Sequence, residues 1–71
     1  MASSTVQSVI FDRKKYTVEK AKNWLKKHGY KYGDVDKKTN HIRFRQVPPE
    51  TFKYFRTKEI SDGIKLILGF K

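Results

Sequence analysis

The sequence predicts a small α+β domain: one amphipathic helix packed on a mostly antiparallel sheet of four to five strands, in the order β-α-β-β-β-β. Three patterns indicate this fold class. Residues 18–28 carry apolar side chains at helical spacing, residues 40–47 alternate strictly between apolar and polar side chains, and residues 64–70 alternate again. We expect residues 1–5 to form a flexible tail and residues 6–71 to form a single basic domain.

The first two elements are predicted from residue type and capping signals. Val6–Phe11 is short, β-branched and aromatic, and a charged stretch closes it, as expected for a strand and turn. Thr17 has the hydroxyl of a helix N-cap, and Gly29 suits a left-handed C-terminal cap. Between them, the apolar or semi-apolar positions of the helix are Val18, Ala21, Trp24, Leu25 and His28.

The remaining elements form a series of strands. Tyr30–Asp36 is the weakest candidate, and a turn over 37–40 pairs it with the strand over 40–47, which Pro48 and Pro49 end. Residues 51–59 alternate imperfectly, so a strand is favoured there and a helix stays open. A turn at 61–63 leads to the last strand, Ile64–Phe70.

Strand parity predicts which side chains meet the helix and which face away from it. The expected core consists of Val9, Phe11, Val18, Ala21, Trp24, Leu25, Ile42, Phe44, Leu66 and Leu68. The face of the sheet turned away from the helix is expected to stay uncovered and to carry His41, Arg43 and Arg45. Arg56 and Lys58, or their neighbours, join them there depending on the strand register.

The charge of the chain indicates a polyanionic partner. Seventeen Lys and Arg against seven Asp and Glu give a formal charge of +10. Arg43 and Arg45 project roughly 7 Å apart on one strand face, close to the phosphate spacing of a nucleic-acid strand, and His41 shares that face. An exposed strand face can also carry charge only as protection against aggregation.

Other residues add to the candidate interface. Lys26 and Lys27 on the helix, with Arg56 and Lys58, are predicted to contact phosphates without reading sequence. Ten aromatic residues exceed what one helix and one sheet need, so some of Tyr30, Tyr32, Tyr54 and Phe55 are candidate platforms for bases, with core or rim packing as the alternative.

Enzymatic chemistry has no support in the sequence. Asp34 and Asp36 border a turn, where acids are common, and no histidine or helical acid completes a metal site. We therefore expect no enzyme activity, no cofactor and no metal. The absence of cysteine and of a long apolar run predicts a protein of a cell interior or a particle, neither secreted nor membrane-bound.

Five stretches, taken in order, resemble a small domain found in proteins of tailed bacteriophages and large DNA viruses. They are V-Q-S-V-I-F-D, A-K-N-W-L-K-K-H-G-Y-K, V-D-K-K-T-N-H-I-R-F-R-Q, F-R-T-K and G-I-K-L-I-L-G-F. The resemblance covers Val6 to Phe70, with W-L-K-K-H-G and R-F-R-Q as its specific parts. It implies a viral source, a host-cell or virion location and a virion-associated role, and it transfers no functional residues.

Two functions are compatible with these patterns. The first is a non-enzymatic nucleic-acid-binding module with low sequence specificity, for DNA or RNA and for single or double strands. The second is a structural virion component or interaction protein that docks on an acidic protein surface or associates with itself, in an oligomeric state that the sequence leaves open.

Overall fold

The computed structural model describes residues 4–71 and has the predicted α+β architecture. Its elements are β1 (Ser4–Asp12), α1 (Val18–Lys27), β2 (Val35–Lys37), β3 (His41–Arg45), the short 3-10 helix η1 (Pro49–Thr51), β4 (Tyr54–Ser61) and β5 (Ile64–Phe70). Of the expected tail over 1–5, Ser4 and Thr5 belong to β1, and the rest lies outside the described residues.

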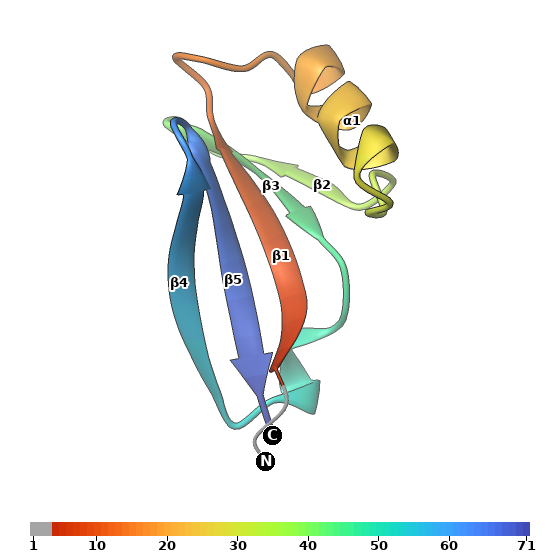
Figure 1. Ribbon diagram of the computed structural model, residues 1–71, viewed down its shortest axis with the longest axis vertical. Helices are drawn as coiled ribbons and strands as arrows, with labels where there is room; N and C mark the ends of the chain where they lie inside the picture. The colour runs from red at the N-terminus through yellow and green to blue at the C-terminus, as the bar shows by residue number, and fades with distance from the viewer. Residues whose placement is uncertain (1–3) are drawn as a thin grey trace.

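The five strands form one antiparallel sheet in the order β2-β3-β1-β5-β4 (Figure 1). β1 lies at the centre, where it pairs with β3 on one side and with β5 on the other. Each neighbour in turn carries its own hairpin partner, β2 or β4. The two edge strands differ in length, because β2 has three residues and β4 has eight.

The ends of α1 follow from local chemistry as predicted. The Thr17 hydroxyl accepts a hydrogen bond from the backbone N–H of Lys20 at 3.2 Å, which satisfies one of the free donors of the first turn. Glu19 lies in the first turn and Lys26 and Lys27 in the last, where each sign of charge is favoured by the helix dipole. Gly29 follows with a φ of +79°, the left-handed conformation that glycine adopts without a steric penalty.

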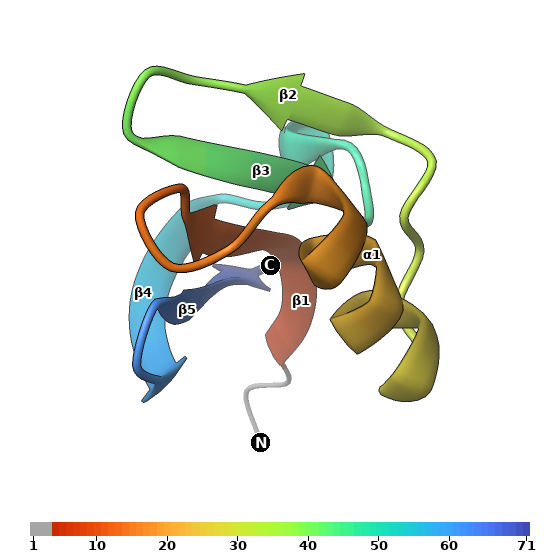
Figure 2. The same ribbon diagram turned by 90° about the horizontal axis from the view of Figure 1, so that it is seen from above.

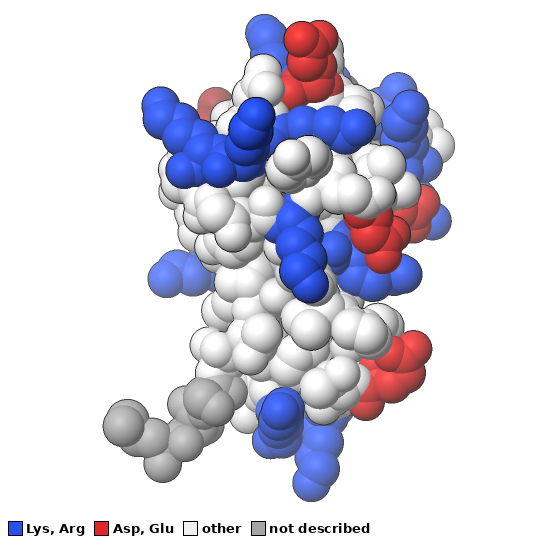
Figure 3. All heavy atoms as spheres, turned by 90° about the vertical axis from the view of Figure 1, so that its right-hand side faces the viewer, with Lys and Arg blue, Asp and Glu red and all other residues white. Residues whose placement is uncertain are grey.

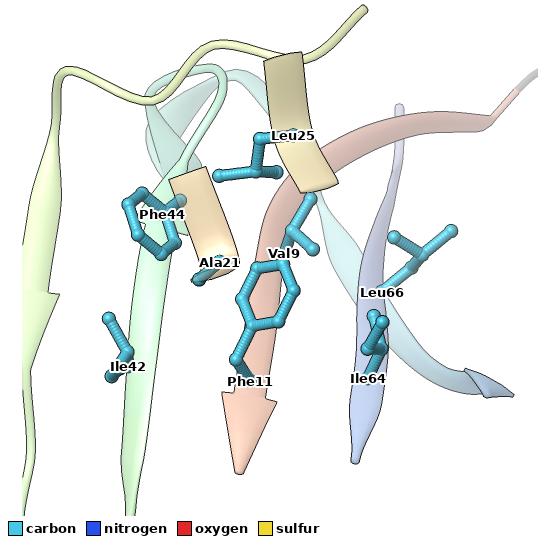
Figure 4. Close-up of a cluster of buried hydrophobic side chains, with 8 residues drawn as sticks. All are labelled: Val9, Phe11, Ala21, Leu25, Ile42, Phe44, Ile64 and Leu66. Carbon is cyan, nitrogen blue, oxygen red and sulfur yellow. The ribbon is translucent and has the colours of Figure 1, made fainter. Parts of the chain in front are cut away.

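One hydrophobic core lies between α1 and the sheet. Ala21 and Leu25 are fully buried, and Figure 4 shows them directed toward Val9, Phe11 and Phe44 on β1 and β3. The complete set of buried apolar residues is Val9, Phe11, Ala21, Leu25, Ile42, Phe44, Ile64 and Leu66. Val18, Trp24 and Leu68, which were predicted to lie in the core, are half-buried and pack against it.

The predicted strand over 30–36 is mostly wrong, because only Val35 and Asp36 of it pair with β3. The side-chain amide of Gln46 takes the place of strand partners at Lys31: it accepts from the backbone N–H and donates to the backbone carbonyl, both at 2.7 Å. Tyr30 turns back to the helix and stacks on Trp24 at 5.9 Å between ring centroids.

The face of the sheet turned away from α1, here called the open face, is partly covered by the connection between β3 and β4. The backbone N–H of Gln46 donates to the carbonyl of Gln7 at 2.7 Å, which holds the connection against β1. Phe52 then lies directly over Gly69 of β5, in space that a Cβ at residue 69 would occupy. The expectation of a fully uncovered second face is therefore wrong over this end of the sheet.

The strong curvature of the sheet separates β4 from the helix. Viewed from above, α1 lies beside β1, β3 and β2, while β4 and β5 turn away from it (Figure 2). The side of β4 that faces in the same direction as α1 thus has no helix over it. Within residues 4–71, no helix has the length and apolarity needed to cross a membrane.

Candidate nucleic-acid interface

Arg43 lies on the open face as predicted, but two of its guanidinium nitrogens bond within the protein. Its Nη2 donates to Oε1 of Gln7 at 2.8 Å and its Nε donates to Oγ of Ser8 at 3.0 Å. Gln7 and Ser8 have no exposed surface. Because Gln7 lies at a β-bulge, where the register of β1 against β5 shifts, its side chain is free to reach the connection and donates to the Val47 carbonyl at 2.8 Å.

The neighbouring sequence-predicted residues of β3 have different surroundings. Arg45 is exposed, and its Nη1 lies 3.9 Å from the carboxylate of Asp34. His41 is half-buried and lines a concavity of about 680 Å³ on the open face. The three side chains that parity places together therefore have separate roles: Arg43 is tied to β1, Arg45 lies beside an acid, and His41 borders a hollow.

This concavity has mixed charge. Its apolar lining comes from Ile10 and Ile67, and its charged lining consists of Asp12, Lys14, Lys15, Glu59, Asp62 and Lys65. The Lys15 ammonium bonds to the Asp62 carboxylate, and this hydrogen bond raises the pKa of Lys15 above its ordinary value of 10.5. With as many acids as lysines around it, the concavity is poorly suited to a phosphate backbone.

Arg56 and Lys58 lie on the other side of the sheet from Arg43. Arg56 pairs with Leu68 and Lys58 with Leu66, and paired residues of an antiparallel ladder share a face. Leu66 is part of the core beneath α1, so both cations face the helix side. Of the two alternatives left open by the register, the structure therefore has the neighbours, Thr57 and Glu59, on the open face, and not Arg56 and Lys58.

The helix side of β4 is basic and aromatic. Tyr54, Arg56 and Lys58 alternate along it, and we call these three residues the β4 strip. All eight residues of β4 are exposed. Tyr54 is 50% exposed and stacks on Phe70 with centroids 4.9 Å apart and planes 7° from parallel. None of the three ion pairs found among residues 4–71 involves Arg56 or Lys58.

The predicted helix lysines lie on the exposed surface of α1. Lys26 and Lys27 are exposed at the end of α1, which also carries Lys20 and Lys22 and only one acid, Glu19. Figure 3 views the molecule from the side of α1 and shows Lys and Arg side chains over the upper part of this face, with Asp and Glu among them. The exposed surface of α1 is thus more uniformly basic than the open-face concavity.

The candidate aromatic platforms separate into packed and exposed rings. Tyr30 packs against the core, whereas Tyr32, Tyr54 and Phe55 are each at least 43% exposed. Sequence reasoning assigned Arg56 and Lys58 to the interface and to the same strand parity as Tyr54, but it left open which side of the sheet that parity faces. The signal that could have located them is the hairpin turn at 61–63. Strands paired across this turn place Arg56 opposite Leu68 and Lys58 opposite Leu66, and therefore on the face of these two leucines.

Comparisons with protein-family models, with curated proteins and with solved structures find no match to this chain. The candidate interface therefore depends on the chemistry and geometry of the chain's own residues.

Proposed function

We propose that this protein is a non-enzymatic nucleic-acid-binding module of low sequence specificity whose contact surface is the β4 strip, supported by the lysines of α1. The observation that carries the proposal is the pair of exposed cations, Arg56 and Lys58, on one face of an exposed strand. Their backbone positions lie roughly 7 Å apart. Arg offers a bidentate fork to a phosphate and Lys a point charge, and neither contact depends on the base.

The distribution of acids supports the helix side over the open face. Asp12, Glu59 and Asp62 line the open-face concavity, and Asp34 and Asp36 lie at the β2 edge, beside Arg45 and Lys38. A polyanion that approaches the helix side of β4 avoids these carboxylates. Arg43, which the sequence places first among the candidates, contributes instead to holding β1 and β3 together.

A salt titration of binding tests the proposal. We expect the affinity for a DNA 20-mer, measured by fluorescence anisotropy, to fall steeply between about 50 and about 200 mM salt. Replacing Arg56 and Lys58 with Ala removes two phosphate contacts, so the slope of log K against log salt should become shallower by between about 1 and 2. The same titration repeated with duplex DNA and with RNA shows which type of nucleic acid the protein binds most tightly.

The matched control removes the same charge from the open face. Lys14→Ala with Lys65→Ala also lowers the net charge by two, but both lysines line the mixed-charge concavity. We expect this control to bind more tightly than the Arg56→Ala, Lys58→Ala variant. Binding that does not depend on salt, or equal weakening by the two variants, would contradict an interface on the β4 strip.

The edge position of β4 favours a second candidate, an interaction protein that takes an acidic partner strand. The outer side of an edge strand has unpaired backbone donors and acceptors that an extended peptide can use. Arg56 and Lys58 would then face acidic side chains of the added strand. Chemical-shift mapping with an acidic, extended peptide tests this candidate: shifts confined to β4 would support it, and shifts absent at high peptide concentration would count against it.

We also propose a viral setting, with the protein in the host-cell interior or in the virion close to the genome. Support comes from the resemblance over Val6 to Phe70 and from the +10 charge, which suits a protein that packs beside nucleic acid. Immunodetection in purified particles, with and without nuclease treatment, tests this setting and separates a genome-associated protein from a shell component.

A further inference from the structure

The aromatic ring of the β4 strip offers a contact that phosphate binding does not use. Tyr54 lies nearly parallel to Phe70, and half of its surface stays exposed. The stacking partner holds the ring in one orientation, so little side-chain freedom remains to be lost when a ligand binds. A planar group that stacks on Tyr54 thus meets a preorganised surface.

A second exposed ring lies next to the first along the chain. Phe55 is 43% exposed on the opposite face of β4 and packs edge-to-face on Phe52, with centroids 5.8 Å apart. Phe52 is in turn fixed over Gly69. The beginning of the edge strand therefore carries an anchored, half-exposed ring on each face, and the cation Arg56 is the next residue along the chain.

We infer that the nucleic acid this surface binds is single-stranded, with a base stacked on Tyr54 and the adjoining phosphates on Arg56 and Lys58. This inference rests on the proposed function and specifies its ligand. In a duplex the bases are stacked on one another and their faces cannot reach a protein ring. In a single strand they can turn outward, and stacking on aromatic rings is available to all four bases, which agrees with low sequence specificity.

The geometry of an extended strand fits this arrangement. Tyr54, Arg56 and Lys58 alternate with residues of the other face, so their side chains leave the backbone at intervals of roughly 7 Å. A single strand that runs along β4 would place one base at Tyr54 and successive phosphates at the two cations. The eight residues of β4 have no helix above them to block this path.

A comparison of Tyr54→Leu with Tyr54→Phe tests the inference. Leu keeps an apolar contact with Phe70 but cannot stack on a base, whereas Phe keeps the ring. Binding is measured at one salt concentration with a single-stranded DNA 20-mer and with the duplex of the same sequence. We expect Tyr54→Leu to weaken single-strand binding by about fivefold to a hundredfold and to change duplex binding less than twofold. Tyr54→Phe should bind like the wild type.

The salt slope separates the failure of this inference from the failure of the proposed function. Tyr54→Leu removes no charge, so its slope should equal that of the wild type. If Tyr54→Leu binds the single strand as tightly as the wild type, or weakens both ligands equally, the single-strand inference is overturned while salt-dependent binding stands. If the wild type binds neither ligand, both proposals fail. Thermal melting of each variant verifies that the fold is retained.

Discussion

The guanidinium of Arg43 reaches across from β3 to the side chain of Gln7 on β1, with 2.8 Å between Nη2 and Oε1. Gln7 is fully buried, and Ser8 donates to the same oxygen at 2.7 Å. An arginine that the sequence presents as a free cation is therefore part of a hydrogen-bond network that joins β1, β3 and the connection after β3.

Arg43→Ala should lower the free energy of unfolding by about 1–3 kcal/mol, because it leaves the buried Ser8 Oγ without a donor and removes one of the two donors to Gln7 Oε1. Urea denaturation measures this change. Arg45→Ala is the control on the same strand: Arg45 is exposed and 3.9 Å from Asp34, so its loss should cost less than about 1 kcal/mol. Equal stabilities of the two variants would contradict a structural role for Arg43.

Gly69→Ala should destabilise the protein, because the new methyl group would occupy the position of the Phe52 ring. We expect a loss of about 1–3 kcal/mol, the usual range for overpacking. In a Phe52→Ala background the same change should cost markedly less, since the obstructing ring is gone. A double-mutant cycle measured by urea denaturation gives this coupling, and strict additivity would show that the contact is unimportant.

Replacing Arg56 and Lys58 with Thr should promote self-association. Consider two copies whose β4 strands pair antiparallel, with Thr57 of one copy opposite Thr57 of the other. Arg56 of each copy would then lie opposite Lys58 of the other. In the two registers in which Arg56 lies opposite Arg56 or Lys58 lies opposite Lys58, identical cations would face each other. Like charges directly opposite destabilise a ladder, so the native strand opposes its own pairing.

Light scattering across a concentration series measures this effect. The Thr variant should show a rising average mass, and the wild type should not. The Lys14→Ala, Lys65→Ala variant, which has the same net charge but an unchanged β4, should behave like the wild type. Association of that control to the same extent would indicate that net charge, and not edge pairing, is responsible.

The ion pair between Lys15 and Asp62 predicts a pH-dependent coupling between two turns. The hydrogen bond to Asp62 raises the pKa of Lys15 above 10.5 in the folded protein. The stability that Lys15 gains from this bond is therefore present below pH 10.5 and is lost as the pH rises through the pKa of Lys15 in the folded protein. A double-mutant cycle with Lys15→Gln and Asp62→Asn should show coupling near neutral pH. The coupling should vanish at strongly alkaline pH, and it should be small because both groups are exposed.

The elements with strong local signals were predictable from the sequence. Thr17 and Gly29 bracket the helix because capping depends on residue type alone, and alternation placed Ile42 and Phe44 in the core. The strand over 30–36 failed because a distant side chain, Gln46, binds the backbone of Lys31. The sequence around Lys31 gives no sign of this bond, because Gln46 lies 15 residues further along the chain.

The candidate site was less predictable, since its faces depend on register. Parity within one strand groups Arg56 with Lys58, but only the pairing of β4 with β5 places them on the side of Leu66 and opposite Arg43. Likewise, a bulge at Gln7 creates the partner that engages Arg43. Residue type alone singled out the cations of the candidate site, whereas the faces on which they lie depend on the fold.

The central position of β1 has a consequence for how this chain folds. Two hairpins, β2–β3 and β4–β5, each close over a short loop and can form quickly, but only β1 joins them, through pairs such as Phe11 with Ile42 and Phe11 with Ile64. Because of their large sequence separation, we expect these contacts to limit the folding rate. Weakening β1 should therefore slow folding.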